Sequence, residues 1–211
     1  MTLEAALAEG IRALGLEIEP AIQSRLLAYV ALLEKWNRTY NLTAIREPGR
    51  MVSHHLLDSL AVLPYLPQAR SLRIVDIGSG GGLPGIPIAL ACPAGSVALV
   101  ESSQKKAAFL RQARAELSLA NAEIVVARIE DYEPDSLFDV AVSRAYAELD
   151  RFASDARRLT PPAGRWLAMK GTYPAEELAK LPPGVRVTAV QRLDVPGLDA
   201  MRHLVIMERA G

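Results

Sequence analysis

The sequence has little of what secreted and membrane proteins depend on. It contains a single cysteine, Cys92, so the chain holds no disulfide framework and suits a reducing compartment. No basic segment followed by an apolar run opens the sequence, and we therefore expect no secretory signal. No uncharged apolar run approaches the roughly 20 residues that cross a bilayer. These absences lead us to expect a cytoplasmic protein that makes no use of a membrane.

An excess of either charge is also missing. Lysine plus arginine and aspartate plus glutamate each number 24, so the formal net charge is zero. Proteins that hold nucleic acid through its phosphates are usually basic. An RNA substrate would therefore have to meet a local basic patch, or a surface that already carries proteins. The 211 residues, of which 50% are apolar, suffice for one domain with a sizeable core.

The most informative segment is Leu72–Pro87, which reads LRIVDIGSGGGLPGIP. A strand-like run enters a turn with four glycines, and an apolar stretch that suits a buried helix follows. Strand, glycine turn and helix together bring backbone N–H groups to a nucleotide-like ligand in α/β folds. Asp76, at the end of the expected strand, favours S-adenosylmethionine, whose amino group is cationic and which carries no pyrophosphate. The spacing of Asp76, Gly78, Gly80 and Gly82 is the pattern expected where this cofactor binds.

Two alternatives to a methyl-donor site exist for this turn, a dinucleotide site and a turn without a ligand. Gly80 to Gly85 satisfies the G-x-G-x-x-G pattern of dinucleotide sites. A fingerprint that begins at the strand end, with Gly78, places Leu83 where a third glycine should permit close helix–strand packing. A turn without a ligand has no need of so many glycines, each of which costs backbone entropy. The sequence favours a methyl donor over a dinucleotide, and either over a plain turn.

Helical spacing of apolar residues predicts three helices in the N-terminal third. They cover Leu3–Leu14, a second segment from about Pro20 to Trp36, and Pro48–Leu63, with a polar turn over Asn37–Glu47. We expect residues 1–68 to form a helical extension packed on a core of residues 69–211.

From Leu72 onward the pattern alternates between strands and helices. Strands are predicted at 72–77, 96–100, 122–126, 138–143 and 164–169, with helices most clearly at 104–118 and 147–159. This alternation predicts a mostly parallel sheet covered on both faces. Strands at about 184–193 and 202–208 have too short a link for a crossover and should form an antiparallel hairpin. We therefore expect an α/β fold of the class I (Rossmann-like) methyltransferase type, with a mostly parallel seven-stranded sheet and a C-terminal antiparallel hairpin.

Residues after the second and third strands are candidates for contacts with a nucleoside. Glu101 can accept hydrogen bonds from both ribose hydroxyls, and its alternative role is an acid at a helix N-terminus with Ser102 or Ser103 as the cap. Ile129 and Glu130 lie where methyltransferases contact the adenine, and the alternative is an ordinary charged loop.

The ends of the fourth and fifth strands bear on the reaction. Arg144 offers a planar, charged donor for a base oxygen, a phosphate or the cofactor carboxylate, and its alternative is a surface ion pair. Lys170 suits a phosphate or a base, or is a solvated lysine. No Asp/Asn-Pro-Pro-aromatic element of amino-directed methyltransferases is present, and Cys92 lies too early to attack a pyrimidine. We predict that His54 and Asp58 form a structural pair rather than a metal site.

Several separated motifs together resemble the RsmG family, also called glucose-inhibited division protein B. They span roughly residues 25 to 175 and comprise Asn41-Leu42-Thr43, His54-x-x-x-Asp58-Ser59, Asp76–Pro87, Ser143-Arg144-Ala145 and Met169-Lys170-Gly171. Members of this family methylate guanine N7 in 16S rRNA. The resemblance implies S-adenosylmethionine as cofactor, with S-adenosylhomocysteine as product. It implies cofactor contacts at Gly78, Leu83, Glu101, Ser102, Ser103, Ile129, Glu130 and Arg144. The pattern of the glycine turn adds Asp76 and Gly80 to the expected contacts.

The resemblance also implies 16S rRNA or the small ribosomal subunit as partner, with Arg144 and Lys170 positioning the acceptor. Guanine N7 has a lone pair and no proton, so we expect no general base, and catalysis mainly by alignment and desolvation. We expect a monomer. Candidate RNA contacts are Arg46, Arg50, Arg144, Arg151 and Lys170, whereas Lys105, Lys106, Arg111 and Arg114 suit a solvated helix face.

Three other functions remain open at this point. A small-molecule methyltransferase would suit the neutral net charge. An NAD-dependent reductase is opposed by Leu83 and by the absence of a Tyr-x-x-x-Lys pair. A scaffold that binds the cofactor without catalysis is opposed by the joint presence of Asp76, Glu101 and Arg144.

Overall fold

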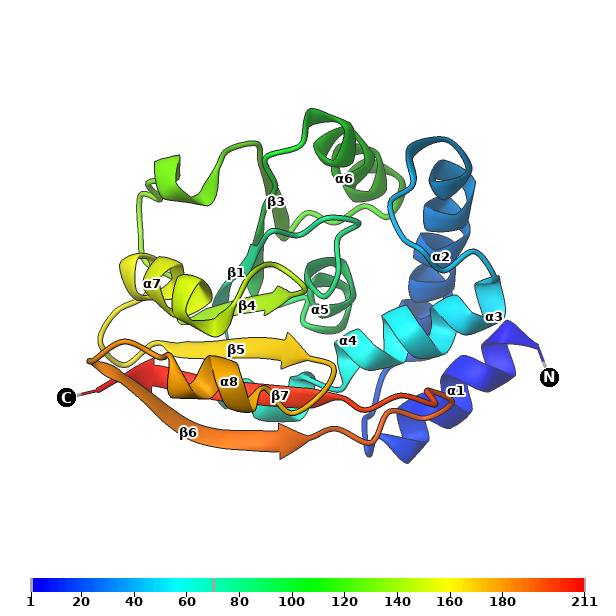
Figure 1. Cartoon of the computed structure of the whole chain (residues 1–211). Coiled ribbons are helices and arrows are strands. Elements are labelled where there is room, and N and C mark those ends of the chain that lie inside the picture. The colour runs from blue at the N-terminus through cyan, green and yellow to red at the C-terminus, as the bar shows by residue number, and fades with distance from the viewer. Residues whose placement is uncertain (1, 70, 211) are drawn as a thin grey trace.

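A mixed sheet of seven strands forms the centre of the computed structural model, which describes residues 2–69 and 71–210 (Figure 1). The strand order is β3-β2-β1-β4-β5-β7-β6. Strands β1 to β5 pair in parallel, and β7 runs antiparallel to both β5 and β6. The strands are β1 (Arg73–Ile77), β2 (Ser96–Val100), β3 (Ala122–Val125), β4 (Val140–Arg144), β5 (Arg165–Lys170), β6 (Val185–Arg192) and β7 (His203–Arg209). The predicted fold class and the C-terminal hairpin are confirmed.

The helices follow the sequence pattern with three departures. They are α1 (Leu3–Ala13), α2 (Pro20–Tyr40), α3 (Pro48–Met51), a π-helix (Val52–Leu57), α4 (Asp58–Leu60), a 3-10 turn (Leu63–Tyr65), α5 (Gly85–Ala91), α6 (Gln104–Glu116), a 3-10 turn (Ile129–Asp131), α7 (Leu149–Leu159) and α8 (Ala175–Ala179). The helix predicted from Pro48 is interrupted by the π-helix, and the short α8 was not predicted. In the part of the chain that the structure describes, no helix is long and apolar enough to cross a membrane.

The third departure is the end of α2, where the predicted turn begins too early. α2 continues through Asn37 to Tyr40 and ends at Asn41, which takes the left-handed conformation with φ of 50°. The Asn37 side chain donates to the carbonyl of Ile45 (3.2 Å) and accepts from the N–H of Thr43 (2.9 Å). A polar residue that looked like part of a turn is therefore a buried helical residue that shapes the next loop.

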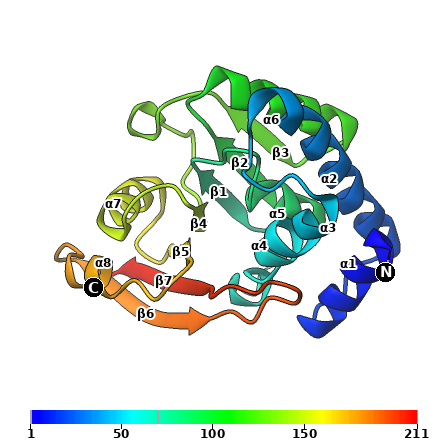
Figure 2. The same cartoon turned by 45° about the vertical axis from the view of Figure 1, so that its right-hand side comes forward.

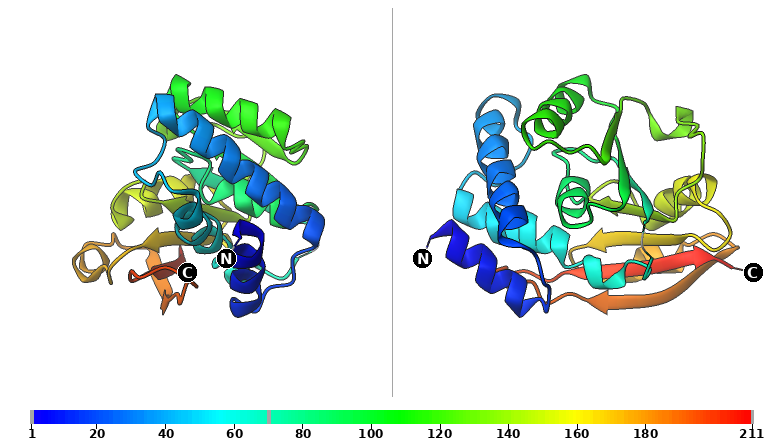
Figure 3. Two further views of the ribbon diagram at one scale, coloured as in Figure 1. Left: turned by 90° about the vertical axis from the view of Figure 1, so that its right-hand side faces the viewer. Right: turned by 180° about the vertical axis from the view of Figure 1, so that it is seen from behind.

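The two faces of the sheet bury separate clusters of apolar side chains. On one face, α1 and α2 join α5 and α6 in a core that includes Leu26, Ile86 and Phe109. The other face is covered by α7 and holds Phe152 and Trp166. Figure 2 shows the N-terminal helices on the same side as α5, and Figure 3 shows α2 alongside α6. The N-terminal helices are thus continuous with the core under the glycine turn.

Replacement of Gly10 in α1 tests how tightly this extension packs. A Cβ at Gly10 would overlap Cδ1 of the buried Leu57 and lie 2.8 Å from its Cδ2. We expect Gly10→Ala to lower the free energy of unfolding by about 1 kcal/mol or more, because overpacking outweighs the gain in helix propensity. Gly49→Ala in α3 is the control, since the nearest atom to its Cβ would be 3.9 Å away. Urea unfolding measures both, and a Gly10→Ala protein as stable as the wild type would contradict the packing described.

Candidate functional site

The turn between β1 and α5 is held by the side chain of Asp76, which is fully buried. Its Oδ2 accepts a hydrogen bond from the N–H of Gly85 (3.0 Å), and Ser79 Oγ donates to the Asp76 backbone carbonyl (3.0 Å). A Cβ at Gly85 would lie 2.6 Å from the same Oδ2. Only glycine lets the start of α5 approach the carboxylate this closely, so the contact with Asp76 requires glycine at position 85.

The environment of Asp76 opposes its negative charge. Burial raises the pKa of this carboxyl to about 7, against the hydrogen bond from Gly85, which lowers the pKa. Its Oδ1 has no hydrogen-bond partner among residues 2–69 and 71–210. A buried polar atom without a partner carries a desolvation cost that a donor from a ligand would relieve. Asp76 therefore offers an unused acceptor beneath the glycine turn.

A cavity of about 350 Å³ lies beside this turn, at the carboxyl ends of the parallel strands. Five residues predicted for cofactor contacts line it: Gly78, Glu101, Ser102, Ile129 and Glu130. The cavity borders β1 and β4, between which the chain changes the direction in which it adds strands. Open α/β sheets bind ligands at this switch point. Its volume falls at the lower end of the range for small-molecule sites, roughly 300–1,000 Å³.

Glu101 links the glycine turn to the start of α6. Its Oε2 accepts from the N–H of Gly80 (2.8 Å) and its Oε1 from the N–H of Ser103 (2.7 Å). Ser103 in turn is the N-cap of α6. A carboxylate oxygen has two lone pairs, so each oxygen of Glu101 retains the capacity to accept from a hydroxyl. The carboxylate thus has both a structural contact and free acceptor capacity at the cavity.

Tyr146 forms a wall of the cavity that sequence reasoning missed. Gly78 has φ of +71°, and a Cβ there would lie 2.5 Å from Tyr146 Cδ2. Tyr146 OH donates to Asp155 Oδ2 (3.0 Å), which also accepts from Arg151 Nε (2.9 Å). The ring is therefore fixed against the glycine turn. Its position directly after the fourth predicted strand could have identified Tyr146 as a site residue from the sequence.

The loop after β3 places one apolar and one charged residue at the cavity. Ile129 is buried, whereas Glu130 is exposed and forms ion pairs with Arg151 (3.3 Å) and Arg128 (4.0 Å). The loop thus presents a fixed apolar side chain beside charges that solvent screens. Lys106, Arg128 and Arg151 also line the cavity, and the sequence had not singled them out for it.

The remaining predicted site residues lie outside this cavity. Asp76, Gly80, Leu83 and Ser103 support the turns around it, and Arg144 and Lys170 lie at the neighbouring strand ends. Leu83 is buried.

Lys170 and Arg144 are both engaged in ion pairs. Lys170 Nζ donates to Glu177 Oε2 (2.6 Å) and to the Ala147 carbonyl (2.9 Å), so this lysine is not simply solvated. Arg144 Nη1 donates to Asp58 Oδ2 (3.0 Å), and this partner is buried rather than part of a surface pair.

The predicted pairing of His54 with Asp58 is wrong. Asp58 accepts from Arg144 and Arg202, whereas the His54 ring contacts Ser53 Oγ (2.8 Å) and Arg50 Nη2 (3.4 Å). The reason is the π-helix, in which residues four apart no longer lie one above the other as they do in an α-helix. Within the described residues, no group of three or more His, Cys, Asp or Glu side chains is placed to hold a metal ion.

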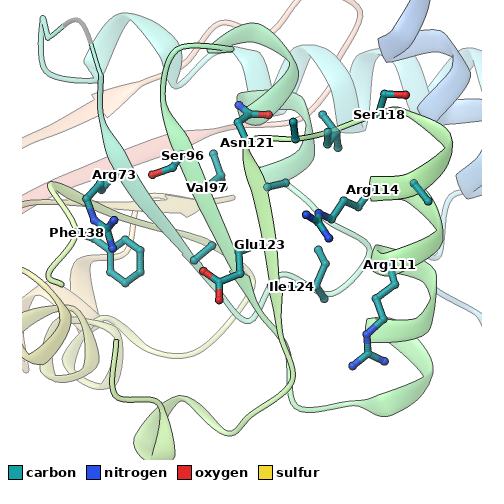
Figure 4. A pocket seen from close by; sticks show the side chains of 15 residues that line it. Arg73, Ser96, Val97, Arg111, Arg114, Ser118, Asn121, Glu123, Ile124 and Phe138 are labelled. Carbon is teal, nitrogen blue, oxygen red and sulfur yellow. The ribbon is translucent and has the colours of Figure 1, made fainter. Parts of the chain in front are cut away.

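A second cavity, of about 720 Å³, lies at the opposite end of β2 and β3. Figure 4 shows Arg73 and Phe138 on one side of β3 and Arg111 and Arg114 on the other. None of the predicted cofactor or acceptor residues lines it. The smaller cavity is the candidate site, because five predicted residues and several charged side chains line it, despite the greater volume of the second.

Known proteins are similar to this chain in sequence and in fold. Residues 22–205 match a family model described as rRNA small subunit methyltransferase G. A protein of that name from Aromatoleum aromaticum is 53% identical over 97% of this chain and 98% of its own length. Another, from Chromobacterium violaceum, is 53% identical over 98% of this chain and 99% of its own.

Solved structures of similar fold are more distant in sequence. TrmN from Thermus thermophilus matches with a TM-score of 0.60 and 17% identity, over 75% of this chain and 53% of that one. A SAM-dependent methyltransferase from Aquifex aeolicus matches with a TM-score of 0.60 and 16% identity, over 85% and 98% of the two chains. At this level of identity the likeness shows the fold.

The raised pKa of Asp76 predicts a pH dependence of stability. The pKa of about 7 exceeds the ordinary value of 3.8, so between these values the folded protein keeps a proton that the unfolded chain releases. The resulting stabilisation is complete below about pH 4 and is lost as the pH rises through about 7. We expect the free energy of unfolding of Asp76→Asn to fall less between about pH 4 and 7 than that of the wild type. Urea unfolding without added ligand measures both proteins across this range. Equal slopes in the two proteins would contradict the burial of an ionisable group at this position.

Proposed function

Because this chain belongs to the rRNA small subunit methyltransferase G family, we propose that it transfers a methyl group from S-adenosylmethionine to N7 of a guanine in 16S rRNA. The observation that carries this conclusion is the 53% identity to a protein of that name over 97% of the chain. The site geometry supports it independently, since a cavity suited to a small ligand lies at the switch point of a sheet shared with other methyltransferases.

The 350 Å³ cavity is the proposed site of S-adenosylmethionine. Glu101 would accept from the ribose hydroxyls, and Ile129 and Glu130 would contact the adenine. The unpartnered Oδ1 of Asp76 suits the cationic amino group, directly or through water. Gly78 lines the cavity and lets the Tyr146 ring pack against the turn, and together they would form a wall beside the cofactor. Of the other proposed contacts, Ser102 lines the cavity, and Gly80, Leu83 and Ser103 lie in the turns that shape it.

Methyl transfer to guanine N7 requires no general acid or base from the protein. When bound, S-adenosylmethionine supplies an electrophilic methyl carbon on a positively charged sulfur. The N7 lone pair forms the new N–C bond as the S–C bond breaks, and the positive charge passes from sulfur to the purine. No proton moves, so the residues of this chain need only orient the acceptor and exclude water. We assign that positioning to Arg144 and Lys170, at the ends of the neighbouring strands β4 and β5. Arg144 pairs with Met169, so the side chains of Arg144 and Lys170 leave opposite faces of the sheet.

RNA contacts are proposed at Arg46 and Arg50, beside the segment that contacts Arg144. Both are exposed, and neither has a carboxylate within ion-pairing distance among the described residues. Their nearest polar contacts are Asn41 Oδ1 (3.5 Å) and His54 Nε2 (3.4 Å). Unpaired guanidinium groups are available to phosphates. A ribosomal substrate would place the protein in the cytoplasm.

Methyl transfer itself is tested with S-adenosylmethionine labelled on its methyl group. Small ribosomal subunits, naked 16S rRNA, a tRNA pool and a small-molecule extract are offered separately, and RNA products are digested to nucleosides. We expect label in 7-methylguanosine from rRNA or subunits, and the better acceptor identifies the natural form of the substrate. Label confined to the small-molecule fraction would instead support the alternative, a methyltransferase for a small molecule.

The proposed RNA surface predicts a change in salt dependence. Arg46→Ala with Arg50→Ala should reduce the slope of log K for RNA against log salt by about 0.7 to 0.9 per lost phosphate contact. Arg111→Ala with Arg114→Ala is the matched control, since these arginines line the cavity of Figure 4, which none of the proposed RNA contacts lines. Filter binding over a range of salt concentrations measures both. A slope altered only in the control pair would move the RNA surface to α6.

A further inference from the structure

The π-helix of Val52–Leu57 leaves one backbone carbonyl free. In an α-helix the N–H of Asp58 would bond to the carbonyl of His54. Here that N–H bonds to the carbonyls of Ser53 and His55 instead. π-helical turns are rare and occur frequently at functional sites. The released carbonyl of His54 must then find a donor elsewhere, because buried backbone groups are almost always paired.

One donor is Arg144, at the carboxyl end of β4. Its Nη1 donates to the His54 carbonyl (2.9 Å) and to Asp58 Oδ2 (3.0 Å). The Asp58 side chain is 1% exposed and that of Arg144 20% exposed. The helical extension therefore presents a carbonyl and a carboxylate side by side, and the guanidinium is fixed between them. Among the described residues no acceptor contacts Arg144 Nε, which leaves this N–H available to a ligand.

Arg202 forms a second ion pair with the carboxylate of Asp58. Its Nε donates to Asp58 Oδ1 (3.0 Å), so each oxygen of Asp58 takes one arginine. Arg202 lies directly before β7, and the single carboxylate thus joins the helical extension, β4 and the C-terminal hairpin. The carboxylate of Asp58 is buried, and losing a partner of a buried charge is costly, so Asp58 holds both arginines in place.

His55 faces Arg144 as a neutral group. Burial, and then the charge of Arg144, lower the pKa of His55 to about 4. Its Nδ1 lies 2.9 Å from the His54 carbonyl and its Nε2 lies 2.8 Å from Thr43 Oγ1, which assigns the proton to Nδ1. The more distant approach of Arg144 Nη2, at 3.4 Å, is then a contact between two donors. The strong acceptors of Arg144 are therefore Asp58 and the His54 carbonyl.

We propose that Asp58 is a positioning residue for methyl transfer. From the π-helical segment, and together with the His54 carbonyl, it fixes Arg144 at the end of β4 so that the free edge of the guanidinium meets the acceptor guanosine. The inference rests on the proposed function and deepens it, because it makes the N-terminal helical extension part of the acceptor site. Asp58 itself does not touch the substrate.

The test is a double-mutant cycle on RNA methylation at saturating S-adenosylmethionine. Asp58→Asn keeps the size of the side chain and removes its charge. We expect it to lower kcat/KM for RNA by about 10- to 100-fold, the cost of misplacing an aligned group. Asp58→Asn added to Arg144→Ala should cause no further loss, because Asp58 acts through Arg144. Affinity for S-adenosylhomocysteine should stay at the wild-type value, since Asp58 does not line the cofactor cavity. If the losses in kcat/KM of the two single variants multiply in the double variant, the proposal is overturned.

Two further variants separate positioning from folding. Arg202→Gln disturbs the same carboxylate but leaves the contacts of Arg144, so its loss of kcat/KM should be smaller than that of Asp58→Asn. An equal or larger loss would show that the cluster serves only stability. If Asp58→Asn does not fold, Asp58→Asn with Arg202→Gln replaces it, because the net charge of that cluster equals that of the wild type. An inactive wild type overturns the proposed function and the inference with it, whereas an active wild type matched by Asp58→Asn overturns the inference alone.

Discussion

The buried carboxylate of Asp76 is the constraint on which the candidate site depends. By accepting from the N–H of Gly85 it ties the end of β1 to the start of α5, and there is no room for a side chain at Gly85. The path of the glycine turn, and with it the position of Gly78 at the cavity, follows from this contact. Burial also raises the pKa of Asp76 to about 7 and leaves Oδ1 unpaired. A cationic donor above the turn would therefore satisfy an atom that the fold leaves without a partner.

The N-terminal helices contribute to the site as well as to the core. Tyr29 of α2 is buried, and its hydroxyl donates to the Gly81 carbonyl in the glycine turn (2.5 Å). Arg25, nearby on the same helix, donates to the Leu117 carbonyl at the end of α6 (2.6 Å). The bonds from Tyr29 to Gly81 and from Arg144 to Asp58 connect the helical extension to both sides of the switch point, and Arg25 joins it to the end of α6. We therefore regard the division into residues 1–68 and 69–211 as a description of the sequence pattern, with one continuous core beneath both parts.

The sequence predicted the sheet because strand and helix periods alternate from Leu72 onward and a short link allows only an antiparallel return at the C-terminus. It also predicted five residues that line one cavity, since residues at the carboxyl ends of neighbouring parallel strands meet at one edge. Contacts between distant segments could not be read in the same way. The joining of Asp58 to Arg144 depends on a π-helix, and the hydroxyl of Tyr29 lies on a helix face that reads as ordinary core. Periodicity locates elements, but it does not say which polar groups meet between them.

Titration calorimetry with S-adenosylhomocysteine tests the central claim most directly, because it measures the cofactor site without requiring the RNA. We expect saturable binding to the wild-type protein and no competition from NAD. Glu101→Gln should weaken that binding by about tenfold or more, because hydrogen bonds from the ribose hydroxyls would lose a charged acceptor. Binding that Glu101→Gln leaves unchanged, or that NAD displaces, would contradict the assignment of the cavity at the glycine turn to S-adenosylmethionine.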